Sequence, residues 1–218
     1  MKPRVSNQKI AALTLVEVLV VIVVVGFLFV SLYPWPEPSA QRKYQRISCV
    51  NNLKQIGLCY HVWSDDHNGM FPMEVAATNG GVMELAAAGN VAAIFQVMSN
   101  ELTLPKILIC PADDNRVAAT NFSVNFKAKN ISYFIGLDGK KNLPGALLSG
   151  DDNLEINGHL IRPGLIDLTA DSSVNWTINR HRSGNVVFAD GSVEMLGNFV
   201  LKKVLKQTGI VTNRFILP

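Results

Sequence analysis

His181 and Asp190 are the residues whose types most directly suggest catalysis, because a histidine and an acid can form the base of a nucleophilic site and the group that orients it. Such a site also needs an activated nucleophile, and the sequence contains no G-x-S-x-G elbow. Asp190 and Gly191 lie between two apolar, β-branched segments, where this pair supplies the positive φ angles of a two-residue type I′ hairpin turn. We therefore interpret Asp190 as a turn residue and His181 as a packing or hydrogen-bonding residue at a strand entrance, and we predict no enzyme.

Two pairs of adjacent acids could supply oxygen ligands to calcium: Asp113 with Asp114, and Asp151 with Asp152. Their spacing does not resemble an EF-hand loop, and acids in such loops commonly form turns and keep the surface soluble. We predict no metal and no cofactor, with calcium at these four acids as the minority hypothesis.

Glu17 is the one acid in the apolar segment from residue 13 to 30. An ionised carboxylate at the centre of a bilayer helix costs roughly 2.5 to 3.5 kcal/mol on insertion scales, so a Glu in such a segment usually has a partner or a function. From Leu15 to Tyr33 the segment would extend about 28 Å as a helix, close to the roughly 30 Å hydrocarbon core of a bilayer. The segment is predicted to cross a membrane.

The elements beyond this span follow from prolines and helical periodicity. The prolines at 34, 36 and 38 predict a break after Tyr33. A second, amphipathic helix is predicted from Ala40 to about Asp66, ended by Asn68-Gly69. Its predicted buried stripe has spacings of three or four residues: Tyr44, Ile47, Val50, Leu53, Ile56, Tyr60 and Trp63.

Beyond residue 70 the pattern predicts a globular head of short elements. Residues 82–104 have weak helical periodicity, and residues 107–110 and 131–137 are typical of strands. A hairpin is predicted around Asp190-Gly191, followed by a short amphipathic helix that ends at Gly209. The head is therefore predicted to be α+β with an antiparallel sheet.

The three cysteines allow two interpretations. Cys49 and Cys59 would lie about 15 Å apart on one helix, beyond the roughly 7 Å limit for a disulfide. Any disulfide must therefore include Cys110, and the alternative is three buried free thiols.

The first twelve residues, MKPRVSNQKIAA, are basic and end in small residues before the apolar segment. A secretory signal peptide has a shorter apolar region and its cleavage site behind that region, whereas here the small residues precede it. The formal net charge of +3 is small and scattered, which argues against a nucleic-acid partner.

This leader resembles that of type IV pilins and type II secretion pseudopilins. In that family a basic leader is cut after a small residue, usually Gly, and the mature chain begins with Phe-Thr-Leu-x-Glu. The segment from Ala12 to Glu17 fits this frame, with Ala12 in place of Gly and Leu13 in place of Phe. The resemblance implies that prepilin peptidase cuts between Ala12 and Leu13 and N-methylates Leu13, and that Glu17 neutralises a neighbouring subunit's amine. The alternative for Glu17 is a local role near the helix start, snorkelling to the headgroups.

Several phrases of the head resemble, in the same order, prepilin-like proteins found mostly in Planctomycetes and relatives of Verrucomicrobia: CVNNLKQIGLCYHVWSDDHNGMFP, CPADDN, SYFIGLD, GDDNL, RHRSGNVVFADGSVEML and NRFILP. Their C-terminal region is marked by a His, nine residues and Asp-Gly, whereas eight residues separate His181 from Asp190-Gly191 here. Related heads commonly carry cysteines at the positions matching Cys49 and Cys110, so the resemblance favours this pair as the disulfide.

The resemblance thus implies a pilin-like chain with a leader (1–12), an assembly helix (13–33), a Pro-rich break (34–38), an amphipathic helix (39–68) and a head (69–218). The expected function is a structural subunit of a type II secretion or pilus-like fibre. Its expected partners are prepilin peptidase, other subunits, the inner-membrane assembly platform and the lipid bilayer. The expected location is the inner membrane, with the N-terminus cytoplasmic and the head periplasmic. The alternative is a membrane-tethered binding or hydrolytic head that does not polymerise.

Overall fold

The computed structural model describes residues 14–33, 38–123, 125–169, 171–177 and 183–218. The chain divides into two compact units, residues 1–41 and 42–218, each described by itself. The predicted cleavage residues Ala12 and Leu13, and the predicted motif residue His181, lie outside the described residues.

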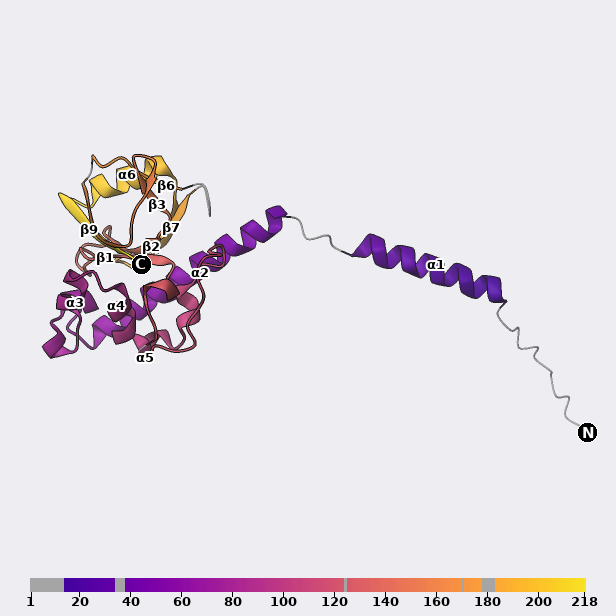
Figure 1. Cartoon of the computed structure of the whole chain (residues 1–218), viewed down its shortest axis with the longest axis horizontal. Coiled ribbons are helices and arrows are strands. Elements are labelled where there is room, and N and C mark those ends of the chain that lie inside the picture. The colour runs from indigo at the N-terminus through magenta and orange to yellow at the C-terminus, as the bar shows by residue number, and fades with distance from the viewer. Residues whose placement is uncertain (1–13, 34–37, 124, 170, 178–182) are drawn as a thin grey trace, which may run out of the picture. The chain divides into compact units, whose positions relative to one another are not determined.

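The first unit contains helix α1 (Leu15–Leu32), drawn in Figure 1, and the residues of this helix are all exposed. Within the described part of the chain, it is the one helix long and apolar enough to cross a membrane, with a mean hydropathy of 3.0. It begins after Thr14 and ends before Tyr33, which is extended. The predicted apolar helix is therefore confirmed.

Helix α2 (Pro38–Asp65) continues into the second unit and ends where Asn68 and Gly69 adopt positive φ angles of 56° and 76°. Gly69 N donates a hydrogen bond to Ser64 O at 2.8 Å, which satisfies a carbonyl of the last turn. The buried face of α2 comprises Cys49, Leu53, Ile56, Tyr60 and Trp63.

The prediction that Tyr44 and Ile47 belong to this buried stripe is wrong, because they are 70% and 52% exposed. The members of the predicted stripe from Tyr44 to Ile56 are spaced three positions apart, and each step of three residues falls about 60° short of a full helical turn. The run therefore winds around the helix, and its first members lie opposite its last. Alternating steps of four and three from Cys49 to Trp63 keep to one face instead.

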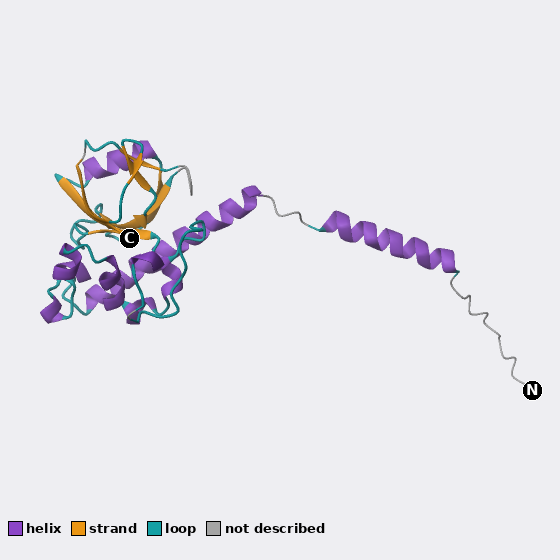
Figure 2. Cartoon of the chain, in the orientation of Figure 1, coloured by secondary structure: helices purple, strands orange, loops and turns teal. Residues whose placement is uncertain are grey.

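The second unit contains a six-stranded antiparallel sheet with the order β5-β9-β1-β2-β7-β8 (Figure 2). Its strands are β1 (Tyr133–Gly136), β2 (Leu147–Asp151), β5 (Gly164–Thr169), β7 (Gly184–Phe188), β8 (Val193–Leu196) and β9 (Thr212–Leu217). A three-stranded antiparallel sheet has the order β4-β3-β6, formed by β3 (Leu154–Ile156), β4 (His159–Leu160) and β6 (Val174–Trp176). The predicted α+β class with an antiparallel sheet is confirmed.

Helices cover both faces of the larger sheet (Figure 1). On one face lie α2, α3 (Met83–Ala87), α4 (Val91–Val97) and α5 (Ser99–Leu102), and on the other lie α6 (Asn198–Gln207) and the small sheet. Successive strand residues enter different cores: Leu148 and Val187 pack on the α2 side, whereas Leu147 and Val186 pack on the α6 side. The helices predicted within 82–104 and before Gly209 are confirmed.

The predicted strand at residues 107–110 is wrong. Pro105–Leu108 is instead a 3₁₀ helix, and the segment after it forms a bend; further 3₁₀ turns are Pro72–Glu74, Ala77–Asn79 and Ala128–Asn130. Leu108 and Cys110 are buried in the core that α2 shares, so the apolar character of the segment comes from packing under a helix and not from sheet pairing. The strand predicted within 131–137 is confirmed as β1.

Substitution of two isoleucines in α2 tests which face is buried. Ile56 is fully buried, so Ile56→Ala should lower the free energy of unfolding by about 2 to 5 kcal/mol. The matched variant Ile47→Ala removes the same atoms from an exposed position and should change it by no more than about 0.5 kcal/mol. Urea unfolding of the full chain in detergent measures both, and equal losses would contradict the burial described here.

Candidate functional site

Glu17 forms a capping box with Thr14 at the start of α1. Its Oε2 accepts hydrogen bonds from Thr14 N and Thr14 Oγ1, both at 3.0 Å, while Thr14 Oγ1 accepts from Glu17 N at 3.3 Å. This arrangement satisfies backbone donors that have no partner within the helix. The predicted local role of Glu17 therefore has a specific geometry, and the exposed carboxylate can still accept a further donor.

The hairpin at Asp190 and Gly191 joins β7 to β8, as predicted, but its turn type is different. Phe188 N donates to Ser192 O and Gly191 N donates to Phe188 O, both at 2.9 Å, and in this loop the positive φ (83°) belongs to Gly191. These features define a three-residue loop, a type I turn followed by a glycine bulge, in place of the predicted type I′ turn.

Asp190 has a structural partner within this loop. Its Oδ1 accepts hydrogen bonds from Ser192 Oγ at 2.6 Å and Ser192 N at 2.8 Å, and the bond from the Ser192 side chain is the main cause that lowers the pKa of Asp190. The loop packs against α2, where a Cβ at Gly57 would lie 3.7 Å from Gly191 Cα. Asp190 therefore shapes the turn that docks on α2.

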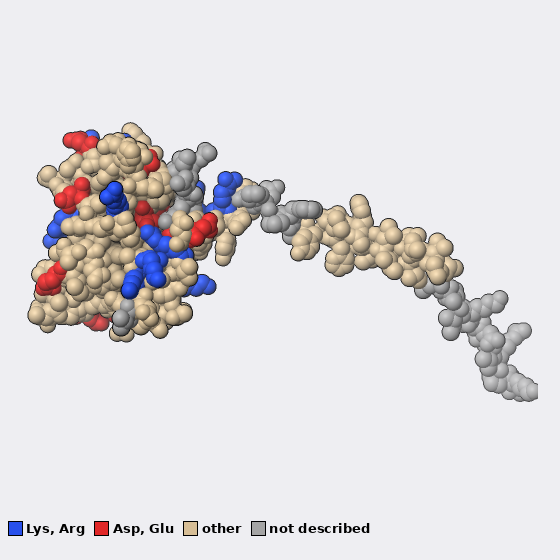
Figure 3. Space-filling model, viewed as in Figure 1, with Lys and Arg blue, Asp and Glu red and all other residues tan. Residues whose placement is uncertain are grey.

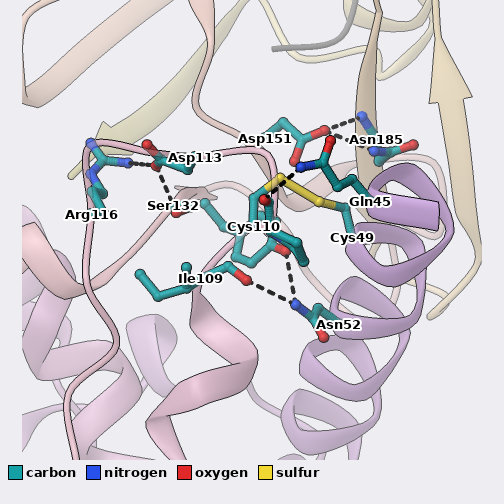
Figure 4. Close-up of a disulfide and its surroundings, with 12 residues drawn as sticks. Gln45, Cys49, Asn52, Ile109, Cys110, Asp113, Arg116, Ser132, Asp151 and Asn185 are labelled. Carbon is teal, nitrogen blue, oxygen red and sulfur yellow. Dashed lines mark hydrogen bonds and ion pairs between the residues drawn. A yellow bond between two sulfur atoms is a disulfide. The ribbon is translucent and has the colours of Figure 1, made fainter. Parts of the chain in front are cut away.

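The acids suggested as calcium ligands are divided among different partners (Figure 4). Arg116 forms ion pairs with both Asp113 and Asp152, and it donates to Pro218 O at 3.1 Å. Asp113 also accepts from Ser132 Oγ at 2.8 Å. The guanidinium supplies the positive charge that these buried carboxylates need, which leaves the calcium hypothesis without support from their geometry. Asp114 is exposed.

Asp151 is fully buried at the end of β2 and holds the neighbouring strand β7. Its Oδ2 accepts hydrogen bonds from Asn185 N at 2.8 Å and Asn185 Nδ2 at 2.9 Å. It also lies close to Cys49 and Cys110, but these cysteines are bonded to each other and offer no thiolate to a metal.

The disulfide between Cys49 and Cys110 is present, with their Cα atoms 5.3 Å apart. Two hydrogen bonds flank it, one turn of α2 before Cys49 and one turn after it. Gln45 Nε2 donates to Pro111 O at 3.1 Å, and Asn52 Nδ2 donates to Ile109 O at 3.0 Å. Gln45, Cys49 and Asn52 therefore attach one face of α2 to residues 109–111, as Figure 4 shows.

Sequence reasoning missed Gln45, Asn52 and Arg116. The spacing of Gln45 and Asn52 from Cys49, one helical turn in each direction, was a signal that these amides share its face. For Arg116 the acid three residues before it, Asp113, was a local signal, but its partners Asp152 and Pro218 come from distant segments.

Thiol counting tests the disulfide against the alternative of three free thiols. In the unfolded, unreduced chain, alkylation should label Cys59 alone, and reduction should expose all three cysteines. In the folded chain Cys59 should resist labelling, because burial, with a smaller contribution from Glu101, raises its pKa to about 11. Labelling of three thiols without reductant would contradict the disulfide.

Cys110→Ser should lower the free energy of unfolding by about 2 to 4 kcal/mol, since the bond closes a loop with a separation of 61 residues.

In comparisons with known proteins, no protein family, no characterised protein and no solved structure matches the chain.

Proposed function

We propose that the chain is a pseudopilin-like structural subunit, held in the inner membrane by α1 and assembled through this helix into a type II secretion or pilus-like fibre. One observation carries the proposal: α1 buries none of its side chains within the chain and places its single acid, Glu17, in the first turn. Figure 3 shows this helix without a Lys, Arg, Asp or Glu on the side in view. A helix of this kind needs lipid or other apolar helices around it.

The head supports the same proposal through its architecture. Helix α2 packs lengthwise against an antiparallel sheet and belongs to the same chain as an exposed apolar helix, which is the plan expected of a pilin-like fold. The head also carries a disulfide, and disulfides persist in oxidising compartments such as the periplasm. The basic residues on both sides of α1 leave its orientation in the membrane open. The disulfide favours the orientation with a periplasmic head and a cytoplasmic N-terminus.

The partners of this function follow from its steps. Prepilin peptidase removes the leader between Ala12 and Leu13, the bilayer stores the subunit, and an assembly platform in the inner membrane brings it to other subunits. In the fibre, the carboxylate of Glu17 pairs with the Leu13 amine of a neighbour, so that neither charge remains alone in an apolar environment.

The mature N-terminus is the first test. We expect purified native protein to begin at Leu13 with an N-methyl group, because the small residue Ala12 and the position of Glu17 fit the processing frame. Mass spectrometry of the N-terminal peptide measures this. An intact Met1–Ala12 leader on protein from cells with an active peptidase would count against processing.

Two substitutions of Glu17 separate its charge from its capping role. Glu17→Gln keeps a side chain that can complete the capping box but removes the charge, whereas Glu17→Ala removes both. Both variants should insert into the membrane, and both should lose multimers, because an unpaired buried amine costs roughly 3 to 5 kcal/mol. Crosslinking in cells through Val24→Cys in α1 measures the multimers.

The outcomes of this experiment exclude different roles. Normal multimers with Glu17→Gln but not with Glu17→Ala would assign Glu17 to capping alone. Undiminished multimers with both variants would overturn the pairing role, whereas an unsubstituted chain that forms no multimers would favour the non-polymerising tethered head.

A further inference from the structure

The face of α2 opposite the head core carries its own apolar residues. Tyr44, Ile47, Leu58 and Val62 are 70%, 52%, 63% and 47% exposed. Leu58 and Val62 lie about four and five helical turns after Tyr44, and Ile47 is one turn after it, so the four side chains share one face over about 27 Å. We call these four residues the outer stripe.

The charges of α2 show what kind of surface the outer stripe fits. Arg42, Lys43, Arg46 and Lys54 are the charged residues from Pro38 to Ser64. The one acid of α2 is its last residue, Asp65, whose Oδ1 forms an ion pair with Lys141 Nζ at 2.7 Å. Lys43 and Lys54 are exposed beside the outer stripe, and blue side chains mark the first turns of α2 in Figure 3. The outer stripe of a second copy would bring cations against cations, whereas an anionic surface with an apolar interior complements both features.

The length of the intervening chain keeps α2 near the end of α1. Six residue steps separate Leu32 from Pro38, and a fully extended chain of this length reaches at most about 20 Å. If α1 crosses a bilayer, the first turns of α2 are therefore within reach of the headgroups.

We propose that the outer stripe of α2 lies in the plane of an anionic lipid surface. Its apolar side chains lie at the boundary between headgroups and acyl chains, and Lys43 and Lys54 lie at the phosphates. The proposal rests on the membrane anchorage in the proposed function, but not on fibre assembly. The opposite face of α2 packs in the head core, so one helix contacts the lipid on one side and the head on the other. The exposure of Tyr44 and Ile47 then has a physical reason, since lipid covers them.

The test uses the full chain reconstituted in vesicles of phosphatidylcholine or of an equimolar mixture of phosphatidylcholine and phosphatidylglycerol. The probe is Leu58→Trp, and its membrane contact is measured as quenching of its fluorescence by lipids brominated in the acyl chain. The unsubstituted chain gives the quenching of the native tryptophans, which is subtracted. The matched control is Phe199→Trp on α6, because Phe199 is also exposed on a basic helix. We expect quenching of the probe in the anionic vesicles, weaker quenching in phosphatidylcholine, and none at the control position.

Charge reversal completes the test. Lys43→Glu combined with Lys54→Glu should reduce membrane contact of the probe by at least about 25-fold, since each basic residue near an anionic surface contributes about fivefold. Both positions are exposed, so thermal unfolding should be unchanged. No quenching at Leu58→Trp, equal quenching in the two lipids, or equal quenching at the control position would overturn the proposal. Crosslinks between copies through Leu58→Cys in place of quenching would assign the outer stripe to a second subunit.

Resistance to alkaline extraction from the same vesicles distinguishes this result from the proposed function. A chain that is extracted fails as a membrane-anchored subunit. An inserted chain whose probe is unquenched overturns the in-plane contact alone.

Discussion

The attachment of α2 to the loop at residues 109–111 is the contact on which the head depends. A long helix presents its buried face as a single stripe, and a rotation by one residue would replace Leu53 and Ile56 with Lys54 and Gly57. The disulfide at Cys49 and the amides of Gln45 and Asn52 fix that rotation at three successive turns. With the rotation fixed, the sheet and the short helices can pack against one continuous apolar surface.

The polar interior of the head follows from the same attachment. Buried carboxylates are costly unless charge and hydrogen bonds compensate them, and Arg116 and Asn185 supply this compensation to Asp113, Asp152 and Asp151. These groups join the loop after Cys110 to the end of β2 and to β7. They hold segments together, and the positions that resemble a metal site by composition serve the packing of strands and loops.

The two long helices meet their surroundings in different ways. Helix α1 has no buried residue within the chain, so its stability depends on an apolar environment that water does not provide. Helix α2 is divided lengthwise, with one face in the head core and the other exposed. The chain thus has one helix that suits an apolar environment along its whole surface and one helix that is divided between the head core and an exposed face.

The features that depend on neighbouring residues could be predicted from the sequence: the apolar helix and its end near Tyr33, the presence of α2 and α6, the strand β1, the hairpin around Asp190-Gly191 and the α+β class. Most failures of sequence reasoning were tertiary. Apolar periodicity at residues 107–110 could not distinguish a strand from a segment buried under a helix, and the three-residue spacing after Tyr44 could not show where the stripe leaves the core. The role of Arg116 and the partners of the acids depend on distant segments, whereas the turn type was a local failure, because it depends on bonds among residues 188–192. Local periodicity specifies which side chains share a face, but what that face contacts depends on contacts between residues far apart in the chain.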